Sequence, residues 1–229
     1  IVDGSLVLRA VSPDGEDGFP GNLELTVRYT LTDENALVLD YTATTDAPTI
    51  INLTNHSYFN LEGQSSGSML EQTLCLNAST FTEGNAETCP TGRILPVAGT
   101  PMDFTRAKPI GRDIQAEYSQ LQMCGGYDHN FILDKEPGML ALAAVARSEK
   151  TGITMETYTT QPGVQLYTSN SLQNDTRPGK TGGIYGRYQG FCLETQHYPC
   201  TPSHPEFPSV ELRPGEEYHE TTIYKFLTE

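Results

Sequence analysis

The chain has 229 residues, 37% of them hydrophobic, which is long enough for one domain to bury a substantial core. Its formal net charge is −15. This acidic balance argues against a nucleic-acid backbone or an anionic membrane as a partner, because both need basic patches, and no hydrophobic run approaches the length that spans a bilayer.

Alternation of apolar and polar residues dominates the chain and predicts half-buried strands. In chain order, strands are expected over 6–11, 22–31, 36–45, 51–61, 69–78, 130–134, 140–148, 152–160, 164–170, 190–198, 209–215 and 216–226. Only residues 106–122 could hold much helix, and Pro109 and Gly111 limit it. The sequence therefore predicts a single all-β domain over residues 1–229, of sandwich or barrel type.

The cysteines give information about the compartment. They are odd in number and form no C-x-x-C pair: Cys75, Cys89, Cys124, Cys192 and Cys200. This pattern argues against a disulfide framework and favours reduced, partly buried thiols in an intracellular protein, so we expect a cytoplasmic location.

The segment INLTNHSYFNL, residues 51–61, has an unusual polar face. In a regular strand, one face of this segment would carry Ile51, Leu53 and Phe59. The opposite face would carry the polar row of Asn52, Thr54, His56, Tyr58 and Asn60. Such a row cannot be buried without partners, so it either faces solvent or lines a cleft for a polyhydroxylated ligand.

Three further predicted strands mix acid, amide and aromatic residues on one parity. Their polar residues are Asp128 and Asn130, then Gln165 and Tyr167, then Glu194, Gln196 and Tyr198. Because hydroxyls need forked hydrogen-bond partners and sugar C–H faces pack on aromatic rings, these strands suggest a sugar site.

Each of these residues also has an ordinary explanation. A histidine in a strand is more often exposed or satisfied than catalytic, and Glu194 could be a solvent-facing carboxylate. Asp128, which follows Gly126 and Tyr127, could belong to an Asx-turn. The remaining histidines lack paired ligand spacing, so no zinc site is indicated.

Taken together, these motifs resemble the aldose 1-epimerase (galactose mutarotase) family over essentially the whole chain. The most specific stretch is NLTNHSYFNL, and GGYDHNFIL, GVQLYTSN and GFCLETQHYP support it. The resemblance implies a large antiparallel β-sandwich and an enzyme that interconverts the α and β anomers of aldohexoses such as galactose and glucose. It implies neither a cofactor nor a metal.

The resemblance also implies roles for individual residues. His56 would be the general acid and Glu194 the general base. Asp128 and Gln165 would hold sugar hydroxyls, and Tyr58 and Ser57 would contribute to substrate binding beside the acid. A small sugar would be the partner of a monomer or weak dimer.

Two features depart from the family pattern. The chain opens on a strand-like segment without Met, and the family's upstream G-R-x-x-N-R and L-H-G-G stretches are not in it. We therefore expect either a fragment or a sequence from which part of the chain is absent, without the N-terminal part of the family's domain that supplies a substrate-binding arginine and a further histidine. By itself, this chain is expected to bind sugar weakly or not at all. In YPCTPSHPEF, Cys200 and Ser203 stand where the family usually has Asp-x-x-Asn.

Alternative functions on the same fold stay open. A non-catalytic sugar-binding module would keep the amides and aromatic rings without needing both acid and base. A hexose-6-phosphate epimerase-like protein would need a cationic pocket, yet the arginines are scattered outside the motif strands. A glycoside hydrolase would need two carboxylates across the bond, for which only Glu194 and Asp128 are candidates.

Overall fold

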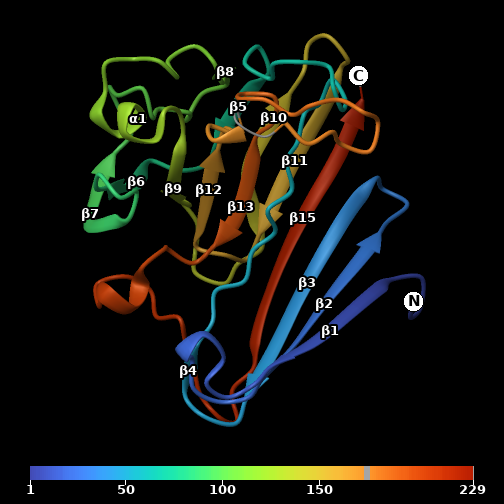
Figure 1. Ribbon diagram of the computed structural model, residues 1–229, viewed down its shortest axis with the longest axis vertical. Helices are drawn as coiled ribbons and strands as arrows, with labels where there is room; N and C mark the ends of the chain where they lie inside the picture. Colours follow the sequence, from blue (N-terminus) through green and yellow to red (C-terminus); the bar gives the residue numbers. More distant parts are fainter. Residues whose placement is uncertain (173–175, 229) are drawn as a thin grey trace.

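The computed structural model describes residues 1–172 and 176–228 and consists almost entirely of strands (Figure 1). The larger sheet contains, in spatial order, β1 (Leu6–Ser12), β2 (Leu23–Leu31), β3 (Ala36–Thr45), β15 (Tyr218–Thr228), β11 (Ile153–Thr159), β10 (Ala141–Arg147), β5 (Thr73–Leu76) and β8 (Lys108–Pro109). The smaller sheet contains β13 (Cys192–Gln196), β12 (Gly163–Tyr167), β9 (Asp128–Ile132), β6 (Thr80–Gly84) and β7 (Pro90–Pro96).

The remaining elements are short. Strands β4 (Thr49–Ile50) and β14 (Glu211–Leu212) pair with each other, and the helical turns are η1 (Glu16–Gly18), α1 (Ser119–Cys124) and η3 (Thr201–Ser203). Helix α1 ends at Gly125, whose φ of 65° is easily reached only without a side chain. Within the described ranges, no helix has the length and apolar character needed to cross a membrane.

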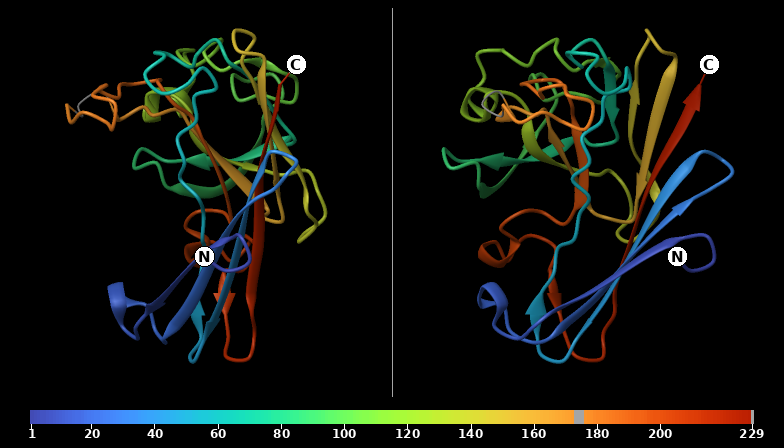
Figure 2. Two further views of the ribbon diagram at one scale, coloured as in Figure 1. Left: turned by 90° about the vertical axis from the view of Figure 1, so that its right-hand side faces the viewer. Right: turned by 45° about the vertical axis from the view of Figure 1, so that its right-hand side comes forward.

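The two sheets pack face to face, and every pairing between the described strands is antiparallel (Figure 2). Thr195 Oγ1 on β13 lies 2.5 Å from Thr222 Oγ1 on β15. The Tyr224 hydroxyl of β15 donates to the Leu193 carbonyl of β13 at 2.9 Å. The predicted antiparallel sandwich is therefore confirmed, and the barrel alternative is not what forms.

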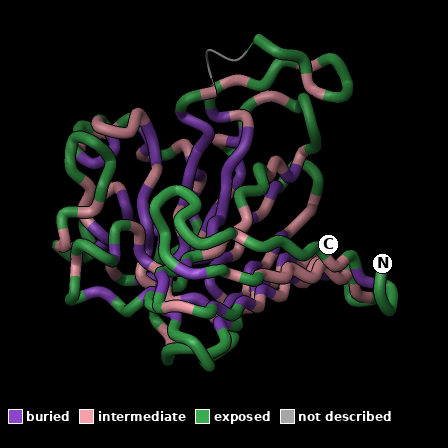
Figure 3. Tube along the Cα trace, turned by 60° about the horizontal axis from the view of Figure 1, so that its bottom comes forward, coloured by how far each residue is buried: buried purple, intermediate pink, exposed green. Residues whose placement is uncertain are grey.

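The core lies between the sheets. Leu39 and Tyr224 from the larger sheet belong to one hydrophobic cluster with Phe81, Leu166 and Leu193 from the smaller one. Figure 3 shows the buried stretches gathered in the interior of the molecule, whereas the segments at its edges are mostly exposed. Since alternate residues of a strand point to opposite faces, the residues between these core positions form the outer face of the smaller sheet.

Most predicted strands are confirmed, but one prediction that concerns the site is wrong. The alternating stretches correspond to β1, β2, β3, β5 and β9 to β15. Residues 51–58 form no strand, and only an isolated bridge pairs Phe59 with Phe191. Strands β6 and β7 were not predicted, because TFTEG is short and polar and PTGRILP begins and ends with proline.

Candidate active site

Strand register collects the predicted polar residues on the outer face of the smaller sheet. Gln165, on β12 between β13 and β9, is directly opposite Glu194 on β13 and opposite Asn130 on β9. Two residues further along β12, Tyr167 is opposite Asp128. Because residues i and i+2 of a strand share a face, Asp128, Gln165 and Glu194 all lie on the side away from the core.

The segment that carries His56 runs as an irregular extended chain because its asparagines take over backbone pairing. Asn52 exchanges two hydrogen bonds with the backbone of His197, at 3.0 and 2.9 Å. The Asn55 side chain accepts the Ser57 amide at 3.2 Å. Such side-chain bonds compete with a regular ladder, which explains why alternation here did not produce a strand.

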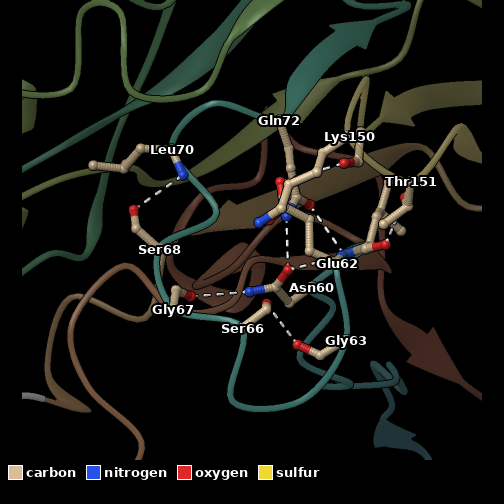
Figure 4. A network of polar contacts seen from close by, with 12 residues as sticks. Asn60, Glu62, Gly63, Ser66, Gly67, Ser68, Leu70, Gln72, Lys150 and Thr151 are labelled. Atoms are coloured by element: carbon tan, nitrogen blue, oxygen red, sulfur yellow. Dashed lines mark hydrogen bonds and ion pairs between the residues drawn. The ribbon is translucent and has the colours of Figure 1, made fainter.

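A buried amide network fixes the end of this segment (Figure 4). Asn60 Nδ2 donates to the Gly67 carbonyl at 3.1 Å, and its Oδ1 accepts Gln72 Nε2 at 2.7 Å. Gln72, which is 1% exposed, also accepts the Leu61 amide at 3.1 Å. The side chain of Asn60 therefore makes its hydrogen bonds within and next to its own loop. Of the polar row predicted from the sequence, His56 and Tyr58 remain available to a binding site.

His56 meets the acidic face of the sheet directly. Its Nε2 lies 3.4 Å from Glu194 Oε1, and its Nδ1 lies 3.4 Å from Cys192 Sγ, so both ring nitrogens have a partner. The Tyr58 ring stacks on the imidazole with centroids 5.1 Å apart, and the Tyr167 ring meets it edge-on at 5.9 Å. Two tyrosines and one β-strand thus fix the orientation of the ring.

These groups surround an open hollow of about 370 Å³. It is lined by His56, Tyr58, Thr88, Met123, Cys124, Asp128, Tyr167, Asn170, Ser171 and Glu194. Gln165 lies next to this hollow, where its Nε2 donates to Asp128 Oδ1 at 2.8 Å. Gln165 Oε1 is buried without a hydrogen-bond partner among the described residues. The floor therefore presents carboxylate and amide oxygens, and the walls present aromatic rings.

Burial and mutual repulsion favour the protonated forms of the acidic groups. The pKa of Glu194 is raised to about 7, chiefly by burial; the charge of His56 lowers this pKa, and the charge of Asp128 raises it. Burial also raises the pKa of Asp128, against the hydrogen bond from Gln165 and the charge of His56. The pKa of the Cys192 thiol is raised by burial, Glu194 and Asp128, so this residue holds its proton.

His56, Cys192 and Glu194 are also a set that could hold a metal ion. Each offers one ligand atom, and these atoms all lie within 4.8 Å of one another. Nitrogen, sulfur and oxygen ligands suit Zn²⁺. Spacing along the sequence gave no sign of this group, because its members come from two distant segments.

The structure brings together five of the six predicted site residues: His56, Tyr58, Asp128, Gln165 and Glu194. Ser57 is exposed and is not among the residues that line the hollow. Its role in substrate binding stays a prediction.

Several residues of the site were not predicted. Cys192 lies two residues before Glu194 on the same strand and therefore on the same face, so the alternation of the sequence could have identified it as a site residue. Thr88, Met123 and Cys124 come from turns and from the end of α1, where no periodic signal exists.

Comparison with known proteins agrees with this fold and geometry. The family model described as "Aldose 1-epimerase" matches residues 2–225. Galactose mutarotase of Homo sapiens is 42% identical over 228 residues, which cover 99% of this chain and 64% of that protein. Aldose 1-epimerase of Escherichia coli K12 is 38% identical over 229 residues, covering 99% and 65%.

Solved structures of aldose epimerases share the fold of this chain. A GalM/aldose epimerase homologue from C. elegans superposes with a TM-score of 0.86 at 31% identity, covering 100% of this chain and 67% of that one. Galactose 1-epimerase from Lactobacillus acidophilus NCFM follows with a TM-score of 0.83 at 30% identity, covering 98% and 63%.

The fold and the outer-face site define an antiparallel β-sandwich protein in which a histidine and a glutamate face each other in an open hollow. The chain belongs to the aldose 1-epimerase family. It spans 64% of the length of the curated relatives that it matches first.

Proposed function

We propose that this protein is an aldose 1-epimerase, an isomerase that interconverts the α and β anomers of aldohexoses such as galactose and glucose. The observation that carries the proposal is the distance of 3.4 Å between His56 Nε2 and Glu194 Oε1. Both residues line a hollow whose walls and floor suit a polyhydroxylated ring. The names of the relatives, galactose mutarotase and aldose 1-epimerase, support the same reaction.

Ring opening needs one proton to leave the anomeric hydroxyl and another to reach the ring oxygen. Glu194 accepts the proton of the C1 hydroxyl, and His56 donates a proton to the ring oxygen as the bond between C1 and that oxygen breaks. The electron pair of this bond stays on the ring oxygen, and C1 becomes an aldehyde. Each proton transfer contributes on the order of 100-fold or more to the rate.

Ring closure reverses these steps after rotation about the C1–C2 bond. The former ring oxygen attacks the opposite face of the aldehyde and returns its proton to His56, while Glu194 gives its proton back to the C1 oxygen. No proton is gained or lost overall. Because the pKa of Glu194 is raised to about 7, both its acidic and its basic form are available near neutral pH.

Asp128, Gln165 and Tyr58 hold the sugar in this scheme. The second oxygen of Asp128 and the unpartnered Gln165 Oε1 are acceptors for sugar hydroxyls, and the hydrogen bond between the two residues keeps them in place. Tyr58, with 47% of its surface exposed, offers a ring face to the sugar C–H groups.

The alternatives receive less support from the same residues. A protein that only binds sugar does not need an acid such as His56 next to a base such as Glu194 whose pKa is raised. A hexose-6-phosphate site needs a cation, but the residues that line the hollow include two carboxylates and neither lysine nor arginine.

Polarimetry of freshly dissolved α-D-galactose tests the proposal. We expect the protein to speed the decay of optical rotation toward its equilibrium value in proportion to enzyme concentration, with glucose as a second substrate. Decay at the buffer rate with both sugars would reject the proposal, and acceleration only with glucose 6-phosphate would favour the phosphate-specific alternative.

A further inference from the structure

Two exposed thiols from distant parts of the chain meet beside the hollow. Cys89 immediately precedes β7, and Cys200 follows β13 and immediately precedes η3. The Cys200 side chain has the Cys89 thiol as a hydrogen-bonding neighbour.

Fixed backbones present both thiols. The Cys89 amide donates to Asn85 Oδ1 at 3.0 Å, and its carbonyl accepts the Asn85 amide at 2.8 Å. The Cys200 carbonyl accepts the Ser203 amide at 2.9 Å. Backbone hydrogen bonds hold both cysteines in place, so the positions of their thiols are set by the backbone and not by flexible side chains.

Contacts beyond the cysteines hold the two segments together. His204 Nε2 lies 3.0 Å from the Pro90 carbonyl, the residue after Cys89. Gly92 is so close to the same segment that a Cβ there would lie 2.8 Å from His204 Nδ1 and 2.5 Å from Glu206 Oε1. The hairpin β6–β7 and the turn at η3 lie near each other in Figures 1 and 2.

Exposure distinguishes this pair from the other cysteines. Cys89 and Cys200 are exposed free thiols, whereas Cys75 and Cys124 are partly buried and Cys192 is buried. Since exchange with a small disulfide needs an accessible thiol, these two are the sites that an oxidant in solution reaches first.

We infer that Cys89 and Cys200 form a redox-active pair that closes to an intramolecular disulfide. The oxidant is a low-molecular-weight disulfide of the glutathione type. One protein thiol loses its proton and attacks a sulfur of the small disulfide, which releases one small thiolate and leaves a mixed disulfide. The second protein thiolate then attacks the protein sulfur of that mixed disulfide, forms the Sγ–Sγ bond and releases the other small thiolate. Two protein thiols are oxidised, one small disulfide is reduced to two small thiols, and the protons pass to these thiols.

The bond would tie the turn that lines one side of the hollow to the segment that follows β13. Thr88, next to Cys89, lines the hollow, and Cys200 follows the strand that carries Glu194. A cross-link between residues so distant in sequence closes a long loop of the unfolded chain, which stabilises the folded state. Oxidation is therefore expected to raise the melting temperature, by on the order of 5 °C or more.

The test equilibrates the protein over a series of reduced-to-oxidised glutathione ratios, alkylates the remaining thiols, and maps peptides without reduction. We expect a monomer that loses the mass of two hydrogen atoms, with Cys89 and Cys200 in one linked peptide and with the higher melting temperature. Cys89→Ser and Cys200→Ser should each abolish the linked peptide and the thermal shift, and should carry a glutathione adduct on the remaining thiol.

Cys75→Ser is the matched control, because it removes one thiol outside the pair and should leave both readouts unchanged. If Cys89 and Cys200 are alkylated at every ratio in a natively folded chain, or link only between molecules, the inference is wrong. None of these readouts depends on epimerase activity, so the result stands apart from that of polarimetry.

Discussion

His56 Nε2 lies 3.4 Å from Glu194 Oε1, although the two residues belong to distant segments of the chain. Glu194 is fixed by the pairing of β13 with β12. His56 is positioned by an irregular segment whose end is tied to the strand region by the bridge between Phe59 and Phe191. A rigid strand therefore supplies the carboxyl group, and a half-exposed loop supplies the imidazole.

Removing either member of the pair should abolish most of the acceleration of mutarotation. We expect Glu194→Gln and His56→Asn each to lower kcat by on the order of 100-fold or more, since each removes one positioned proton carrier. Circular dichroism should show an intact fold, because both side chains point to the outer face. A rate like that of the wild type in either variant would remove that residue from the mechanism.

The pH dependence should report the raised pKa of Glu194. Because the ionised carboxylate is the base, kcat/KM should rise with pH through a midpoint near 7 on the acidic side. The negative charge of Asp128 contributes to this raised pKa, so Asp128→Asn should move the midpoint to lower pH, whatever it does to the maximal rate. The exposed Glu136, outside the hollow, gives the control Glu136→Gln, which should leave the midpoint in place. A midpoint unchanged in Asp128→Asn would contradict this account of the electrostatics.

Cys192 should act as a positioning residue for His56. The Cys192 sulfur lies 3.4 Å from Nδ1, so it can accept the Nδ1–H of the imidazole and leave Nε2, which faces Glu194, to carry the proton that is given to the sugar. We expect Cys192→Ala to lower kcat by about fivefold, the equivalent of one net hydrogen bond of ~1 kcal/mol, with a smaller change in KM.

Cys192→Ser keeps a hydrogen-bond acceptor at this position and should recover part of the rate. At a pH at which His56 is neutral, its ¹⁵N signals should show the Nδ1–H tautomer in the wild type and the serine variant, and a mixture of tautomers in Cys192→Ala. Identical signals in all three proteins would show that the thiol only fills space.

The buried amide network should be needed for the stability of the His56 segment. Gln72→Ala leaves the buried Leu61 amide without its partner and removes one of the two donors to Asn60 Oδ1, which should cost about 1–3 kcal/mol in the free energy of unfolding. Lys150→Ala removes an exposed partner of Glu62 in the same region and should cost no more than about 1 kcal/mol. Urea denaturation measures both, and equal losses in the two variants would contradict the importance assigned to Gln72.

Sequence patterns predicted the fold well where one face of a strand is buried. In β3 and β11 the alternation of apolar and polar residues matches the burial of the structure closely. The same pattern in residues 51–61 identified the buried side, since Ile51 and Leu61 are in the core, but not the irregular backbone. Three asparagines that bond to nearby or facing backbone explain that difference, and their partners could not be known from the sequence.

The site was predicted in part, for similar reasons. Asp128, Gln165 and Glu194 could be placed on one face because they share parity on their strands, and the family motif drew attention to His56. The meeting of Cys89 with Cys200, and of Cys192 with His56, depends on contacts between loops and strands that are distant in sequence. Loop conformation has no periodic signal, so these neighbours emerge only from the folded chain.

Exchange between anomers can be followed at equilibrium by transferring magnetisation from the α to the β C1–H signal of galactose. The account predicts that the protein raises this exchange rate in proportion to its concentration, and that Glu194→Gln, folded and at equal concentration, leaves the rate at the buffer value. Exchange that is unaffected by the wild-type protein, or raised equally by Glu194→Gln, would contradict the claim that His56 and Glu194 open and close the sugar ring.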